Sequence, residues 1–205
     1  MRKCKNQIRE KYVYEIISQF QEDQNLDTYP LDPKEIIKKN NWYLIPYTDF
    51  HEDLMALSKD GFTYYYDGKY FIYYNTMKPA NRIRFTLFHE IGHIILNHHT
   101  EFKKEILQSS ENTTFMESEA NIVARNLMAP AHIIRNLYTE MNNLIPEIFK
   151  MSDEASINRI RWINKDYKEI KYKNSNFLLP EIERLNRIFE ENYLYENTWQ
   201  SAHSY

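Results

Sequence analysis

The most informative stretch of the chain is NRIRFTLFHEIGHIILN, residues 81–97. Its apolar residues recur at intervals of three and four, which predicts an α-helix with a broad apolar face. His89, Glu90 and His93 interrupt that apolar pattern. Ionisable side chains in an apolar helix cost free energy unless they have partners. The triplet therefore indicates a functional site in the middle of a core helix.

The spacing of the two histidines predicts a metal site. His89 and His93 are four residues apart, so a helix places both imidazoles on one side, within reach of one cation. Glu90 is better placed to handle a bound water than to bind the metal. Zinc (Zn²⁺) is the expected metal, because neutral imidazole suits it and a catalytic zinc needs only three protein ligands. We therefore expect His89 and His93 to be metal ligands and Glu90 to be catalytic.

A third ligand must come from elsewhere. His99 has the spacing of the third histidine in HExxHxxGxxH metallopeptidases, but that pattern needs a glycine where this chain has Leu96. A continued helix would carry His99 about 120° around the axis from His93. We therefore interpret His98 and His99 as histidines at a helix end, near the negative end of the dipole.

Two glutamates remain, Glu117 and Glu119. If Glu117 binds the metal, Asn121 lies one helical turn further on the same face, where it can hydrogen-bond a metal-bound histidine. Metal-bound histidines usually have such an outer partner. If Glu119 binds the metal, the equivalent position is Val123, which offers no hydrogen bond. Glu117 is the preferred third ligand, with Asn121 supporting the site, and Glu119 is interpreted as a residue on a solvated helix face.

The rest of the chain predicts an α+β fold. Residues 62–66 and 69–74 flank Asp67-Gly68 and form a β-hairpin signal, and residues 42–46 read as a further strand that ends at Pro46. Helices are expected at residues 7–21, 33–39 and 115–128. We expect a small three-stranded antiparallel or mixed sheet packed on a mostly helical body. Residues 1–170 are the predicted domain, and residues 171–205 are a helical C-terminal extension packed on it.

Composition narrows the function classes. The chain has 205 residues, a net charge of −3 and no block of like charges, which argues against direct nucleic-acid binding. A mean hydropathy of −0.71 without a long apolar run argues against a membrane span. No signal peptide is visible, and the single cysteine, Cys4, fits a reducing compartment, so we expect a cytoplasmic protein. Oligomeric state is not predicted.

Residues 81–93, together with ESEAN at 117–121 and LMAP at 127–130, resemble the ImmA/IrrE family of zinc metallopeptidases. The resemblance covers about residues 60–130. It implies a zincin-like body in which His89, His93 and Glu117 bind zinc and Glu90 is the catalytic glutamate. It also implies a context, since family members typically lie beside helix-turn-helix repressors of mobile elements or stress responses and cleave them.

The expected activity is therefore zinc-dependent hydrolysis of a peptide bond in such a repressor. The strand before the metal helix is expected to border the cleft and to pair with an extended substrate through Tyr70, Ile72 and Tyr74. The donor to the oxyanion stays open among Tyr73, Tyr74 and His132. The alternative function is a non-catalytic zinc-bound module that sequesters a repressor, and the intact Glu90 favours the enzyme.

Overall fold

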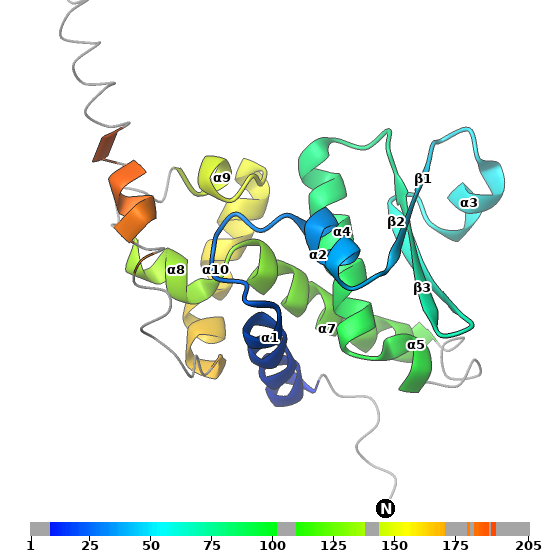
Figure 1. Cartoon of the computed structure of the whole chain (residues 1–205), viewed down its shortest axis with the longest axis horizontal. Coiled ribbons are helices and arrows are strands. Elements are labelled where there is room, and N and C mark those ends of the chain that lie inside the picture. Colours follow the sequence, from blue (N-terminus) through cyan, green and yellow to red (C-terminus); the bar gives the residue numbers. More distant parts are fainter. Residues whose placement is uncertain are drawn as a thin grey trace, which may run out of the picture.

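The computed structural model describes residues 9–101, 110–137, 144–170, 180, 183–188 and 190–191. It confirms the α+β class: a small sheet lies at one end of the molecule and a helical body at the other (Figure 1). Among the described residues, no helix is long and apolar enough to cross a membrane.

The sheet is mixed and has the strand order β1-β3-β2. β3 lies in the middle, parallel to β1 and antiparallel to β2. Asp67 and Gly68 connect β2 to β3 with φ values of 48° and 73°. Two successive positive φ angles are typical of the tight turn that Asp-Gly favours, so the hairpin prediction is confirmed. The strands are β1 (Tyr43–Tyr47), β2 (Gly61–Tyr66) and β3 (Lys69–Asn75).

β1 differs from the sequence prediction, because it continues through Pro46 to Tyr47. Among the described strands, β1 lies at the edge of the sheet and pairs with β3 alone. An edge strand tolerates proline, whose missing N–H can lie on the unpaired side. A further helix that the sequence analysis did not predict, α3 (Glu52–Leu57), lies between β1 and β2.

The helices mostly match their predicted positions. The second helix begins and ends as predicted: Asp32 caps it by accepting a hydrogen bond from the backbone N–H of Lys34 at 2.8 Å, and Pro33 occupies the first helical position. The first helix has the expected length but lies three residues later than predicted, and the long helix after the metal motif begins five residues earlier than predicted, at Ser110. The helices are α1 (Glu10–Gln24), α2 (Pro33–Lys39), α4 (Ala80–Ile95), α5 (His98–Glu101), α7 (Ser110–Met128), α8 (Ala131–Asn136), α9 (Ile145–Ile148) and α10 (Asp153–Glu169).

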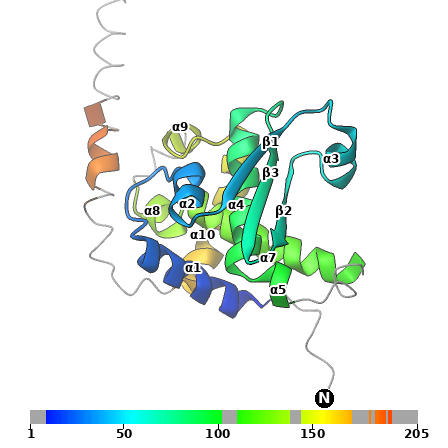
Figure 2. The ribbon, with the colours of Figure 1, turned by 45° about the vertical axis from the view of Figure 1, so that its right-hand side comes forward.

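α4 is the central helix of the fold. It contacts β2 and β3 on one side and α7 on the other (Figures 1 and 2). Leu87, Phe88 and Ile91 are buried in the core. A Cβ added at Gly92 would lie 3.0 Å from the backbone oxygen of Ala120 in α7, so the glycine allows the two helices to pack closely.

A buried charge network joins the helical body. Asp166 of α10 is fully buried and accepts hydrogen bonds from Tyr14 of α1, Arg125 and Asn126 of α7, and Arg159 of α10. Removal of one partner from such a network would leave a buried charge uncompensated. The network therefore fixes α1, α7 and α10 relative to one another.

Most of the predicted C-terminal extension lies outside the described residues. Residues 183–188 are helical. Leu185 is buried with the core, and Arg184 donates a hydrogen bond to the backbone oxygen of Tyr29. The division of the chain at residue 170 stays a prediction.

Replacement of Gly92 by Val should destabilise the protein by about 2 kcal/mol, because the added carbons meet the backbone of α7. The variant should also bind metal more weakly, since α4 and α7 must move apart. Urea unfolding and metal titration measure the two effects. Gly68→Ala is the control: its Cβ meets nothing within 4 Å, but its φ of 73° is strained for alanine. It should lower stability alone, and equal metal affinity in all three proteins would contradict the prediction.

Candidate metal centre

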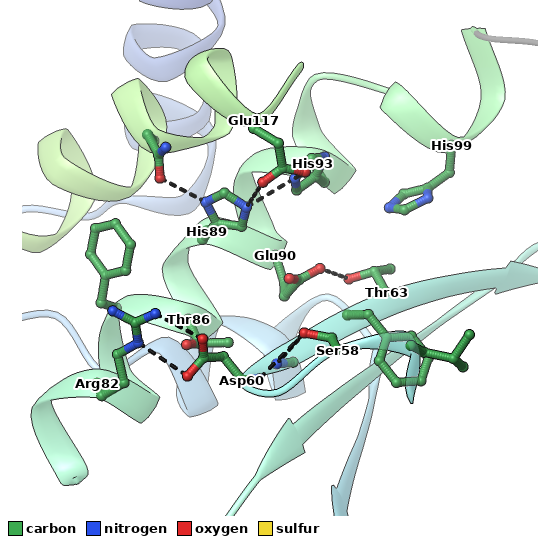
Figure 3. Close-up of a pocket in the computed structure, with 15 residues that line it drawn as sticks. Ser58, Asp60, Thr63, Arg82, Thr86, His89, Glu90, His93, His99 and Glu117 are labelled. Atoms are coloured by element: carbon green, nitrogen blue, oxygen red, sulfur yellow. Dashed lines mark hydrogen bonds and ion pairs between the residues drawn. The ribbon is translucent and has the colours of Figure 1, made fainter. Parts of the chain in front are cut away.

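The structure brings His89, His93 and Glu117 together in one cluster (Figure 3). Nε2 of His89 lies 3.0 Å from Nε2 of His93 and 3.0 Å from Oε2 of Glu117. Nε2 of His93 lies 3.4 Å from Oε1 of Glu117. The two histidines come from successive turns of α4, and the carboxylate comes from the neighbouring α7.

These separations fit a tetrahedral metal. Zinc binds nitrogen and oxygen at about 2.0–2.2 Å, so two ligands of a tetrahedral site lie roughly 3.3 Å apart. Two imidazole nitrogens and a carboxylate converge here at comparable distances. The residues present therefore fit a divalent metal held by His89, His93 and Glu117, with room for a further ligand on the open side.

Both histidines present Nε2 to the cluster and have a polar partner at Nδ1. Oδ1 of Asn121 lies 2.9 Å from Nδ1 of His89, which is the contact expected from the spacing of Glu117 and Asn121 on α7. Nδ1 of His98 lies 2.9 Å from Nδ1 of His93. Such partners orient a ligating imidazole and fix which nitrogen is free for the metal.

Glu117 and Glu119 have opposite environments. The side chain of Glu117 is 55% exposed, whereas that of Glu119 is fully buried. Glu119 accepts hydrogen bonds from His98 and from both the backbone and the guanidinium of Arg9. The interpretation of Glu119 as a solvated surface residue is therefore wrong. The geometry places Glu117 in the cluster and Glu119 behind it.

Glu90 lies beside the cluster and borders a cavity of about 470 Å³. Oγ1 of Thr63 in β2 donates a hydrogen bond to Oε2 of Glu90 at 2.8 Å (Figure 3). The second carboxylate oxygen stays available on the cavity side. Besides these two residues, the cavity is lined by Gly61, Phe62, Arg82, His89, His93, His99 and Glu117, among others.

The strand that borders the cavity is β2, not β3. The prediction that Tyr70, Ile72 and Tyr74 form a substrate-binding edge is wrong, because β3 is the middle strand and pairs with β1 and β2 on its two sides. β2 pairs with β3 alone among the described strands, and its first three residues line the cavity. The hairpin signal could not reveal this, since it says nothing about where β1 adds to the sheet.

None of the three candidate oxyanion donors lines this cavity. Tyr73 and Tyr74 lie on the central strand, and His132 is buried in α8, where burial and Arg159 lower its pKa to about 3. His99 of α5 lines the cavity instead and points toward it (Figure 3). Its Nε2 is buried and has no hydrogen-bond partner among the described residues. Burial, His93 and His98 lower the pKa of His99 to about 4, so it is neutral at pH 7.

Hydrogen bonds and charges within the cluster shift the pKa values of its members in opposite directions. Hydrogen bonds from His89 and His93 hold the pKa of Glu117 well below its usual range. Burial would lower the pKa of His89, but hydrogen bonding to Glu117 and the charges of Glu90 and Glu117 raise it above its usual value. Protonation of His89 therefore competes with metal binding.

Sequence reasoning missed Thr63 and Arg9, and it assigned His98 to a helix end and Glu119 to a solvated face, away from the positions behind the cluster that the structure gives them. Asn97 offered a signal for His98, because asparagine after the last helical residue often adopts a left-handed conformation, and here its φ is 55°. That turn sends His98 back toward His93. No local signal could pair Arg9 with Glu119, since the two are 110 positions apart.

Two histidines one turn apart on a core helix, a carboxylate from a second helix and a further glutamate beside an open cavity define a metallopeptidase-like site. The chain belongs to the M78 peptidase family: the family's sequence model, described as the IrrE N-terminal-like domain, matches residues 48–161, which is more than half of the chain. The match confirms the resemblance to the ImmA/IrrE family. A search of curated proteins found no match to this chain.

A divalent metal should stabilise the fold, because the cluster joins α4 to α7 and exists only in the folded state. At a free metal concentration one hundred times the Kd, the gain is about 2.7 kcal/mol. Glu117→Gln should lose most of the metal-induced rise in Tm, measured by differential scanning fluorimetry. Glu154→Gln, at an exposed site on α10, should keep it. An undiminished rise in the Glu117 variant would contradict the assignment of this ligand.

The metal-induced rise in Tm should grow as the pH increases from 6 to 8. A histidine whose pKa is raised in the folded state stabilises the metal-free protein below its unfolded pKa of about 6.5. That contribution is lost as the pH rises through the folded pKa of His89. Metal binding requires the neutral imidazole and strengthens over the same range. A rise in Tm that is the same at both ends of this range would contradict proton competition at His89.

Proposed function

We propose that this protein is a zinc-dependent endopeptidase that hydrolyses a peptide bond in a regulatory protein. The observation that supports this most directly is the position of Glu90 between the His89–His93–Glu117 cluster and an edge strand, in an open cavity. Family membership supports peptidase chemistry. Zinc is the proposed metal because two neutral imidazoles and one carboxylate are a donor set typical of catalytic zinc sites.

When bound, zinc would supply a Lewis acid that lowers the pKa of a water and polarises a carbonyl group. The protein's contribution to proton transfer lies in Glu90, which accepts a proton from the attacking water and returns it to the leaving amine. The hydrogen bond from Thr63 holds the carboxylate in one orientation and leaves Oε1 for the proton. Glu90 is 6% exposed, so its burial limits competition between bulk water and the attacking water for the carboxylate.

His99 is the proposed donor to the carbonyl oxygen as negative charge develops there. It is neutral, lines the same cavity and has an unsatisfied ring nitrogen in the described structure. A fixed N–H group aimed at the developing charge stabilises the transition state more than the ground state. His99 thus replaces Tyr73, Tyr74 and His132 as the candidate.

An extended polypeptide is the proposed form of the substrate. The unpaired side of β2 can add one more strand through backbone hydrogen bonds. A second cavity of about 500 Å³ shares Arg82, Phe85 and Asn121 with the first and reaches α10. The two cavities together offer space for residues well beyond the cleaved bond, which favours an endopeptidase.

The proposed substrate is a helix-turn-helix repressor of a mobile element or stress response, which the protein meets in the cytoplasm. One support is the resemblance to the ImmA/IrrE family. The other is that the sequence has no block of basic residues, which argues against direct DNA binding by this protein. The test begins with a search of the neighbouring reading frames for a helix-turn-helix repressor; that repressor is then mixed with the protein, with and without a chelator, and cleavage is located by mass spectrometry.

Replacement of Glu90 by Gln should lower cleavage of that repressor by a factor of about 10²–10⁴, because the proton acceptor is lost. The metal content of the variant should stay at one ion per chain, measured by atomic emission. Glu35→Gln, on the exposed side of α2, is the matched control and should cleave normally. Full cleavage by the Glu90 variant would exclude Glu90 as the base.

The alternative function is sequestration of the repressor without cleavage. The same Glu90→Gln protein separates the two, because it keeps the cavity and the metal ligands. If it binds the repressor and relieves repression in cells as well as the unaltered protein does, sequestration is the function. If relief of repression disappears together with cleavage, the protein acts as an enzyme.

His99→Leu should lower kcat by a factor of about 10²–10³ with little change in KM, since the lost hydrogen bond forms mainly in the transition state. His99→Gln retains a donor and should recover part of the rate. Steady-state kinetics on a peptide that spans the cleaved bond give both constants. A change confined to KM would instead place His99 in substrate binding.

A further inference from the structure

A buried chain of polar groups begins at the side of His93 that faces away from the metal cluster. Nδ1 of His93 lies 2.9 Å from Nδ1 of His98, and Nε2 of His98 lies 3.1 Å from Oε2 of Glu119. His98 and Glu119 are fully buried. Arg9 completes the chain, because its backbone N–H lies 2.7 Å from Oε1 of Glu119 and its Nη2 lies 2.9 Å from Oε2.

We infer that His98, Glu119 and Arg9 form a relay that fixes the tautomer and the orientation of His93 as a metal ligand. The inference rests on the metal site of the proposed function and adds three positioning residues to it. None of the three belongs to the ligand cluster itself.

The direction of each hydrogen bond follows from simple proton counting. A hydrogen bond between two imidazole nitrogens needs one N–H group and one lone pair. If Nε2 of His93 binds the metal, the remaining proton of the neutral ring is on Nδ1, which donates to Nδ1 of His98. A neutral His98 then has its proton on Nε2, where the carboxylate of Glu119 accepts it. Each ring nitrogen of His93 and His98 therefore has one role, as metal ligand, hydrogen-bond donor or hydrogen-bond acceptor, and these roles are mutually consistent.

The relay ends in a charge that the protein stabilises strongly. Glu119 is fully buried and forms an ion pair with the guanidinium of Arg9 at 2.9 Å, which stabilises its carboxylate as an anion. A buried anion needs paired and hydrogen-bonded surroundings. Arg9 supplies both an ion pair and a backbone donor.

The two ligating histidines therefore differ in their outer partners. His89 faces the neutral amide oxygen of Asn121, whereas His93 connects through His98 to an anion. A carboxylate behind a metal-bound histidine raises the basicity of the ligand and locks the ring. His93 is the more firmly oriented ligand of the pair.

Metal affinity tests the relay without reference to cleavage. The Kd for zinc is measured by competition with a chromophoric chelator, in buffer where urea unfolding shows each variant to be folded. His98→Leu removes the acceptor and should weaken affinity by a factor of about 10–100. His98→Asn places an amide oxygen near the position of Nδ1 and should recover most of that loss. Glu119→Gln keeps an acceptor but removes the anion, and its loss should be smaller.

His51→Leu is the matched control, because it makes the same substitution at an exposed histidine outside the ligand cluster and outside the relay. Its zinc affinity should equal that of the unaltered protein. Equal affinity in His98→Leu and the unaltered protein would overturn the relay. Failure of the unaltered protein to bind zinc would overturn the relay and the proposed function together, so the two failures are distinguishable.

A second measurement needs no substitution. Long-range ¹H–¹⁵N spectra of the zinc-loaded protein, labelled at histidine nitrogen, report which ring nitrogen has the proton. The relay predicts Nδ1–H for His93 and Nε2–H for His98. An Nδ1–H form or a doubly protonated ring at His98 would overturn the assignment.

Discussion

The close contact between α4 and α7 is the constraint on which the site depends. Gly92 permits that contact, and it faces Ala120 and Val123 of α7. The candidate ligand cluster forms across the same contact, since α4 provides both histidines and α7 provides Glu117. A side chain at Gly92 would widen the separation that sets the distances between the ligand atoms. The same close contact between α4 and α7 therefore determines both the packing of the two helices and the distances between the ligand atoms.

The faces of α7 have separate roles. Glu117 and Asn121 face the cavity side, and Ala120 and Val123 pack on α4. Glu119 contacts Arg9 at the start of α1. On the far side of α4, Gly61 allows β2 to approach Thr86 closely, and Asp60 pairs with Arg82 at 2.7 Å. These contacts place Thr63 against Glu90, so the carboxylate of Glu90 is held between a strand and the cluster of His89, His93 and Glu117.

The elements near the site were predictable from the sequence because their signals are local. Each of these signals depends on residues that are close in the sequence: the three-and-four spacing of apolar residues in α4, the Asp-Gly turn, and the one-turn spacing of Glu117 and Asn121. The structure places all these residues as their spacing predicts. Zinc, cleavage and the repressor stay proposals, because spacing alone does not identify a metal or a substrate.

What the sequence could not predict depends on contacts between distant segments. The order of the strands follows from the parallel pairing of β1 with β3. No sequence pattern within β1 or β3 indicates which strand each one pairs with. The burial of Glu119 depends on Arg9, and a glutamate in a helix is otherwise more common on a surface. The chain has 17 tyrosines, and the sheet accounts for some of them, since Tyr64 and Tyr66 are exposed on it and Tyr43 stacks on Phe71. The tyrosines near the C-terminus lie outside the described residues.

The contact of Arg9 with Glu119 also bears on where the folding unit begins. The sequence match to the family starts at residue 48, after α1 and α2. A fragment cut at that boundary would keep all three predicted ligands and Glu90. It would lose the cation that neutralises Glu119, together with Tyr14, a partner of Asp166. The start of the family match and the start of the folding unit are therefore different, and the N-terminal helix helps to support the candidate metal centre.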